Sequence, residues 1–191
     1  MGKVVVTEFV SVDGVFEDPG GSEGTDLGAW TFEFDRGDDG NKFKLDETMA
    51  SDALLLGRVT YEGFADAWPN RSGDEFSDKF NNMPKYVVSS TLKDPEWNNS
   101  TVIGADLENE VPKLKEQHEG EIAVHGSGQL ARALLDQGLV DEVRLMVFPV
   151  VLGRGRQLFD GIEQHTLKLA DSKPVGPDGI VVLTYEPAEQ K

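Results

Sequence analysis

The chain has 191 residues and a mass of 20.9 kDa, enough for one domain with a hydrophobic core. Thirty-five Asp and Glu residues against 18 Lys and Arg give a formal charge of −17, which disfavours binding to nucleic acid or to an anionic membrane surface. The absence of cysteine excludes disulfides, thiolate catalysis and cysteine zinc sites, and no histidine pair has metal-ligand spacing, so we expect no metal.

A β-branched, mostly apolar stretch near the start of the chain, KVVVTEFV at 3–10, predicts a first strand. This run is too short for a signal peptide or a membrane span, and no later stretch approaches 18 apolar residues. We therefore expect a cytoplasmic protein with no membrane partner. Asp13 and Gly14 have turn chemistry, and the loop over 11–40 is rich in glycine and acidic residues. A loop of this length is typical of a lid or binding segment, and we expect its part at 14–34 to close over a substrate.

Helical and strand patterns alternate from residue 41 onward. Helices are predicted at 41–51, 58–68, 107–118 and 127–138, and strands at 52–57, 84–90, 100–104, 121–126 and 141–153. Two further strands, 165–176 and 179–187, form a hairpin around Pro177-Asp178-Gly179. This order predicts an α/β fold, with a mixed, mostly parallel sheet flanked by helices and an antiparallel C-terminal hairpin. We expect residues 1–191 to form a single domain.

Two strand-to-helix turns carry glycine where the backbone must approach another group closely: LLLGRVTYE, with Gly57, and IAVHGSGQLA, with Gly126 and Gly128. Glycine removes the Cβ that would obstruct a pyrophosphate, and the amides at the start of the next helix attract anions. The spacing Gly126-x-Gly128-x-x-Ala131 also matches the Rossmann fingerprint, but it lies in the last third of the chain rather than after the first strand. The turns predict a phosphate-binding site at the carboxyl edge of the sheet.

The chain resembles the dihydrofolate-reductase-like fold, specifically the C-terminal reductase domain of the riboflavin-biosynthesis protein RibD and its stand-alone relatives. Five segments in the family's order carry the resemblance over nearly the whole chain: SVDG, LLLGRVTYEGF, KYVVSSTL, VHGSGQLARALLDQGLVDEVRL and FPVVLGRGRQLF. The resemblance implies an NADPH-dependent oxidoreductase acting on a small heterocycle, similar to 5-amino-6-(5-phosphoribosylamino)uracil reductase of riboflavin biosynthesis. The deaminase half of RibD needs zinc-binding cysteines, which this chain lacks.

The resemblance assigns ten residues in three segments to the NADPH cofactor. These are Gly57, Arg58 and Thr60 for the pyrophosphate and the 2′-phosphate; Ser89, Ser90 and Thr91 for the adenosine ribose and its 2′-phosphate; and Gly126, Ser127, Gly128 and Gln129 for the pyrophosphate.

The same resemblance places Asp13 at the reacting end of the site as the candidate catalytic residue, with an Asx-turn that only holds the Asp-Gly turn as the open alternative. Trp30 and Phe34 are candidates to stack on a flat substrate. Arg154 and Arg156, in FPVVLGRGRQLF, are candidates for a substrate phosphate, and Arg154 is preferred. True dihydrofolate reductases carry a carboxylate in the helix where this chain has Asn41, which favours the RibD branch. Dihydrofolate reductase and a non-catalytic nucleotide-binding protein are the alternatives.

The segment DEVRLMVFPVV at 141–151 is more apolar than one sheet face of a monomer requires. Because RibD-like domains commonly pair through this region, the resemblance implies a homodimer.

Overall fold

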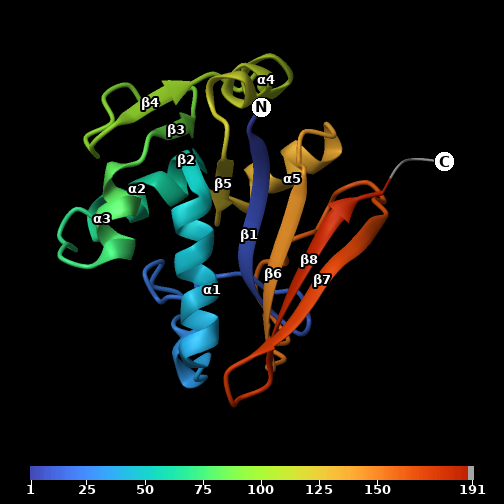
Figure 1. Ribbon diagram of the computed structural model, residues 1–191. Coiled ribbons are helices and arrows are strands. Elements are labelled where there is room, and N and C mark those ends of the chain that lie inside the picture. The colour runs from blue at the N-terminus through green and yellow to red at the C-terminus, as the bar shows by residue number, and fades with distance from the viewer. Residues whose placement is uncertain (189–191) are drawn as a thin grey trace.

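In the computed structural model, which describes residues 1–188, eight strands form one sheet with helices packed on both faces (Figure 1). The strands are β1 (Lys3–Ser11), β2 (Ser51–Gly57), β3 (Lys85–Val88), β4 (Ser100–Ile103), β5 (Glu121–His125), β6 (Glu142–Phe148), β7 (Leu167–Val175) and β8 (Ile180–Pro187). The helices are α1 (Gly37–Ala50), α2 (Arg58–Ala67), α3 (Glu75–Asn82), α4 (Leu107–Gln117) and α5 (Gly128–Asp136), with a short 3-10 helix η1 (Trp30–Glu33).

The strand order is β4-β3-β2-β5-β1-β6-β8-β7. The six strands from β4 to β6 are parallel, whereas β8 pairs antiparallel with both β6 and β7. This confirms the predicted mixed, mostly parallel sheet with an antiparallel C-terminal hairpin. β1 lies between β5 and β6, with Thr7 opposite His125 on one side and Arg144 on the other. The ends of the central parallel strands therefore lie together at one edge.

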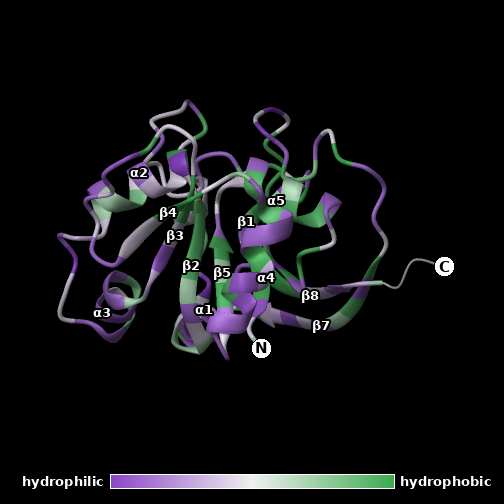
Figure 2. Ribbon diagram, turned by 90° about the horizontal axis from the view of Figure 1, so that it is seen from above, coloured by the Kyte–Doolittle hydropathy of each residue, from purple (hydrophilic) through white to green (hydrophobic). Residues whose placement is uncertain are grey.

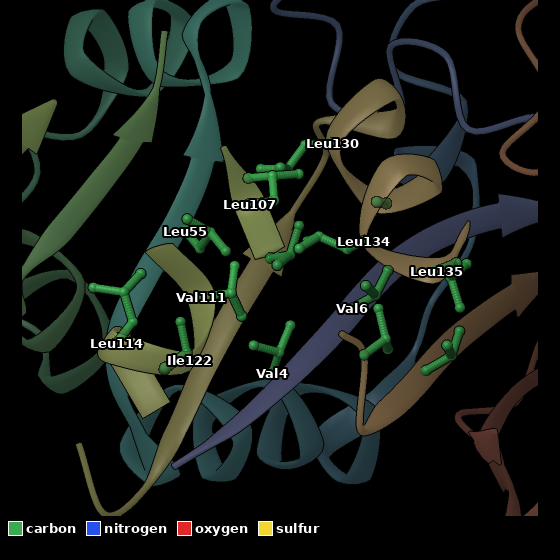
Figure 3. Packing of buried hydrophobic residues seen from close by; sticks show 14 of the residues in the cluster. Val4, Val6, Leu55, Leu107, Val111, Leu114, Ile122, Leu130, Leu134 and Leu135 are labelled. Atoms are coloured by element: carbon green, nitrogen blue, oxygen red, sulfur yellow. The ribbon is translucent and has the colours of Figure 1, made fainter. Parts of the chain in front are cut away.

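The largest hydrophobic cluster lies between the sheet and the helices α4 and α5 (Figure 3). Leucines 107, 114, 130, 134 and 135 of these helices point toward Val4, Val6, Leu55 and Ile122 of the strands, and all of these side chains are buried. On the other face, α2 and α3 pack on β2 and α1 packs toward β6 and β8. Covering both faces explains why the central strands are almost continuously apolar rather than alternating (Figure 2).

The long loop after β1 is shorter and more ordered than the sequence pattern predicts. Helix α1 begins at Gly37 instead of 41, and Asp38 and Asp39 lie in its first turn, where the helix dipole favours acidic side chains. The buried carboxylate of Asp18 accepts hydrogen bonds from the backbone N–H groups of Glu23 and Thr25, both at 2.9 Å. These bonds fold the acidic segment around one internal carboxylate.

Helix α3 was not predicted, although its cap follows a common pattern: the Asp74 carboxylate accepts a hydrogen bond from the backbone N–H of Ser77 at 2.9 Å. The predicted strand at 141–153 ends earlier, at Phe148, because Pro149 cannot donate a backbone hydrogen bond to the ladder. No helix within residues 1–188 is long and apolar enough to cross a membrane.

The apolar segment 141–151 packs largely within the chain. Val143, Met146 and Phe148 of β6 are buried. Val147 packs against a small cluster that includes Val10 and Phe16. Val151, at 70% exposure, is the exception. The excess of apolar residues therefore has an intramolecular explanation, and the homodimer stays a prediction that rests on the family resemblance alone.

Candidate active site

A cleft of about 1810 Å³ opens where the parallel strands end. Its walls come from the segments that follow β2, β3 and β5, from α1, and from the loop after β1. All ten residues that the resemblance assigns to the cofactor line this cleft. Small-molecule pockets commonly measure about 300–1,000 Å³, so the cleft has room for two ligands side by side.

The two glycine turns are joined into one unit. The Ser127 hydroxyl accepts a hydrogen bond from the backbone N–H of Gly57 at 2.9 Å, and the backbone N–H of Ser127 donates to Thr60 Oγ1 at 2.9 Å. Both Gly126 and Ser127 have left-handed backbone conformations, with φ of 56° and 57°. The turns bring together the N-termini of α2 and α5, neither of which has a side-chain cap. A bound anion is a suitable partner for the first-turn amides of such helices.

The glycines in these turns are required for different reasons. A Cβ on Gly57 would make only ordinary contacts with Ser127, at 3.6 Å. At Gly126 the positive φ itself favours glycine. A Cβ on Gly128 would lie 2.2 Å from Cζ of Phe16, whose ring packs against this residue. The contact that first demands glycine at 128 is therefore made within the chain, whether or not a phosphate also approaches.

The third segment, after β3, forms a turn stabilised by a hydroxyl. Ser89 Oγ accepts hydrogen bonds from the backbone N–H groups of Thr91 at 3.1 Å and Leu92 at 3.0 Å. Its proton can still be donated, since Thr91 Oγ1 lies 3.4 Å away. Arg58, which also lines the cleft, forms an ion pair with Glu62 one helical turn later in α2, at 2.8 Å. Both of those side chains are nearly half exposed, so the pair contributes only about 0.5 kcal/mol and a phosphate can compete for the guanidinium.

A network of charged side chains lies on the α1 side of β1. Lys44 donates a hydrogen bond to Thr7 Oγ1 at 3.1 Å and also pairs with the buried Glu47. Arg144 lies 3.5 Å from Glu47 and forms two hydrogen bonds with Glu121, at 2.6 and 2.8 Å. Burial alone would raise the pKa of Glu47, but the Lys44 ammonium and other partners outweigh burial and lower it. The network holds the Lys44 side chain at the wall of the cleft.

The assignment of Asp13 as the catalytic residue is not supported by its position, because Asp13 does not line the cleft. Its carboxylate accepts hydrogen bonds from Ser11 Oγ at 2.6 Å and from the backbone N–H groups of Leu152 at 3.1 Å and Gly153 at 2.8 Å. The Ser11 hydroxyl, followed by the Gly153 amide, lowers the pKa of Asp13 to about 2. Asp13 is therefore an ionised acceptor that ties the turn after β1 to the segment after β6.

We expect Asp13→Asn to lower stability by about 1–2 kcal/mol and to leave binding in the cleft unchanged, because an amide cannot accept all three hydrogen bonds as well. The folded-state pKa lies below the ordinary 3.8, so this stabilisation is complete above about pH 4 and is lost as the pH falls toward 2. Urea denaturation of both proteins between pH 2 and 7 measures the difference. A constant difference across this range would contradict the assignment.

Of the two aromatic residues assigned to the substrate, Phe34 lines the cleft and Trp30 does not. Trp30 is 4% exposed and does not line the cleft; its indole N–H donates to the Glu17 carbonyl at 2.9 Å, and its ring packs on Phe148. A buried ring cannot stack on a ligand. Phe34 does line the cleft, and so does Phe32, which is 75% exposed. In a strand, residues 30 and 32 would face the same side. Because they lie in the 3-10 helix η1 instead, Trp30 faces inward and Phe32 faces outward.

Arg154, assigned to a substrate phosphate, is exposed and lies outside the cleft lining, whereas Arg156 lines the cleft and pairs with Glu17 and Glu23. Sequence reasoning also missed Glu8, which lines the cleft from β1. The signal was visible: a carboxylate inside the mostly apolar KVVVTEFV. Lys44 carried no such signal, since a lysine on a helix is ordinary.

Comparisons with known proteins agree with this fold. Residues 2–181 match the family model of the RibD C-terminal domain. The uncharacterized protein YyaP of Bacillus subtilis is 30% identical over 139 residues, which cover 70% of this chain and 73% of that protein. A putative riboflavin biosynthesis protein from Shewanella sp. PV-4 has a TM-score of 0.77 at 21% identity, with 98% of this chain and 99% of that one covered. A dihydrofolate reductase from Enterococcus faecalis, solved with NADP(H) and RAB-propyl, has a TM-score of 0.63 at 16% identity, with 98% of both chains covered.

The sheet order and these structural matches define a fold of the dihydrofolate-reductase-like class. Because the family model spans nearly the whole chain, the protein belongs to the RibD C-terminal domain family, which confirms the resemblance.

Proposed function

We propose that the protein is an NADPH-dependent reductase of a small heterocycle, resembling 5-amino-6-(5-phosphoribosylamino)uracil reductase. One observation carries the proposal: the segments after three neighbouring parallel strands, β2, β3 and β5, line a single cleft, and two of them are hydrogen-bonded to each other. Ligands of open α/β sheets bind at this edge. The similar Enterococcus fold was solved with NADP(H), and the Shewanella neighbour is described as a putative riboflavin biosynthesis protein, which supports the cofactor and the substrate class.

The residues of the cleft suit this cofactor. The uncapped N-termini of α2 and α5 offer amides and positive dipole ends to a pyrophosphate. Arg58 offers a cation for the 2′-phosphate, and the hydroxyl groups at 89–91 offer donors. When bound, NADPH would supply the hydride. The chain would orient the partners and exclude water, with Phe9, Phe34 and Phe148 forming an apolar wall.

The substrate is argued from the α1 end of the cleft. Asn41 lines it, and its amide oxygen accepts a hydrogen bond from Arg36 Nε at 2.9 Å. A neutral amide beside the Lys44 ammonium cannot favour a protonated pterin as a carboxylate does. An aminouracil that carries its own polar groups and a phosphate suits the site better, with Arg156 as the cation for that phosphate in place of Arg154.

The decisive assay follows NADPH oxidation with dihydrofolate and with 5-amino-6-(5-phosphoribosylamino)uracil side by side. We expect turnover of the aminouracil and little turnover of dihydrofolate, even at acidic pH. Efficient reduction of dihydrofolate would favour the folate enzymes instead. Tight NADPH binding without oxidation by either compound would favour a non-catalytic nucleotide-binding protein.

The cofactor preference is tested by Arg58→Leu. Losing a charge-assisted contact to the 2′-phosphate should weaken NADPH binding about 10-fold and leave NADH binding unchanged. Calorimetry with both cofactors measures the effect. Arg154→Leu, which removes an exposed arginine outside the cleft, is the matched control and should change neither affinity. Equal losses for NADPH and NADH would show that Arg58 does not contact the 2′-phosphate.

A further inference from the structure

Glu8 is a buried carboxyl group at the floor of the cleft with no assigned role. It is 7% exposed, lines the cleft, and its Oε1 has no hydrogen-bond partner within residues 1–188. Buried polar atoms are nearly always paired, so an unpaired carboxyl oxygen in a ligand-sized cleft indicates that a ligand supplies the missing partner.

The position of Glu8 follows from the sheet. Side chains alternate along β1. Glu8 therefore points to the face of the sheet opposite to Thr7, which accepts a hydrogen bond from Lys44. On the neighbouring strand its register partner is Leu145, which packs with the apolar cluster of Val10 and Phe16. This apolar setting disfavours the charged form of a carboxyl group.

The electrostatic surroundings point the same way. Burial raises the pKa of Glu8 well above its ordinary 4.5. The Gly126 backbone and the Lys44 ammonium of α1 oppose this rise, whereas the carboxylates of Glu47 on α1 and Glu23 in the loop after β1 add to it. Burial outweighs the opposing contacts, so the carboxyl group keeps its proton to a higher pH than an exposed glutamate.

Other titratable groups near the cleft suit a proton donor less well. Asp13 lies outside the cleft and is ionised. Burial lowers the pKa of His125 to about 3, so its imidazole holds no second proton at neutral pH. If Lys44 gave up its proton, the buried Glu47 would lose its ion-pair partner.

We propose that the neutral carboxyl group of Glu8 donates the proton that accompanies hydride transfer to the substrate. This role rests on the proposed reductase function. Reduction of a C=N or C=O bond breaks its π bond, places the hydride and its electron pair on carbon, and requires one proton on nitrogen or oxygen. Glu8 supplies that proton, becomes a carboxylate, and is reprotonated from solvent through the open cleft. A positioned general acid commonly contributes a factor of about 10²–10⁴ to the rate.

The test compares wild type, Glu8→Gln and Glu8→Asp for NADPH affinity, kcat and the pH dependence of kcat/KM. We expect Glu8→Gln to bind NADPH within twofold of wild type and to lose about 100-fold or more in kcat. In wild type, kcat/KM should fall tenfold per pH unit above the pKa of Glu8, because only the protonated form is active. Glu8→Gln should lack this alkaline limb, and Glu8→Asp should retain it at a lower rate. Glu108→Gln, the same change at an exposed position of α4, is the control.

A second readout needs no ligand. In protein carrying ¹³C-labelled glutamate, the carboxyl resonance that disappears in Glu8→Gln should titrate well above 4.5. An ordinary titration, or Glu8→Gln with wild-type kcat and an intact alkaline limb, would overturn the role of Glu8 while NADPH binding and turnover still support the reductase. Failure of wild type to bind NADPH would instead overturn the proposed function, and the proton-donor role with it.

Discussion

Replacing Lys85 with methionine should destabilise the fold by about 3–5 kcal/mol, the largest stability loss that we expect from a single substitution in this chain. Lys85 is fully buried, and its ammonium donates hydrogen bonds to three backbone carbonyls: Asn81 at 2.7 Å, Met83 at 2.9 Å and Asn98 at 2.9 Å. Methionine fills a similar volume but leaves those three acceptors without their donor. Equilibrium urea denaturation gives the change in the free energy of unfolding.

The matched control is Lys93→Met, since Lys93 is exposed on the neighbouring loop and should change stability by less than about 0.5 kcal/mol. A loss below about 1 kcal/mol in Lys85→Met would mean that the carbonyls find other partners. Lys85→Met should also disturb the part of the cleft formed by the Ser89–Thr91 turn. The bonds of Lys85 join the end of α3 to the segment before β4, and the Ser89–Thr91 turn follows β3 directly.

The fold could be predicted because its signals are local. Apolar strands, glycine turns and the Pro-Asp-Gly turn can each be recognised from fewer than ten consecutive residues. The alternation of strands and helices favours parallel pairing. The same holds for the segments that the resemblance assigns to a cofactor, since strand ends in a parallel sheet converge on one edge. Their placement around one cleft therefore follows from the topology.

The positions of Asp13 and Trp30 outside the cleft depend on contacts between distant parts of the chain. The resemblance assigned Asp13 to catalysis. Its partners, Leu152 and Gly153, lie about 140 residues away in the sequence, and no local pattern marks them. Trp30 depends in the same way on the Glu17 carbonyl and on Phe148. From the sequence, Lys85 is expected to be the polar first residue of a strand. Its burial could not be predicted, because its three acceptors are backbone carbonyls, which every residue carries.

Gly128→Val should raise the Kd of NADPH by at least about 100-fold. It should also lower the free energy of unfolding by about 1–3 kcal/mol. The sequence alone predicts only the first effect, through a clash with the pyrophosphate. The structure adds the second, because a Cβ at 128 lies 2.2 Å from the buried Phe16 ring. Calorimetry and urea denaturation measure the two effects separately. Gly104→Val is the control, since a Cβ there meets nothing within 4 Å.

The two causes are separated by combining Gly128→Val with Phe16→Ala. Removing the ring makes room for the valine, so the double variant should be more stable than the sum of the single changes predicts. If the glycine also serves a phosphate, NADPH binding should remain lost in the double variant while Phe16→Ala alone still binds. If binding returns together with stability, Gly128 is required only by Phe16, and the phosphate site reduces to the remaining amides of α2 and α5. Because a valine at 128 clashes with the Phe16 ring whether or not a phosphate binds, this double variant separates a packing requirement from a binding requirement.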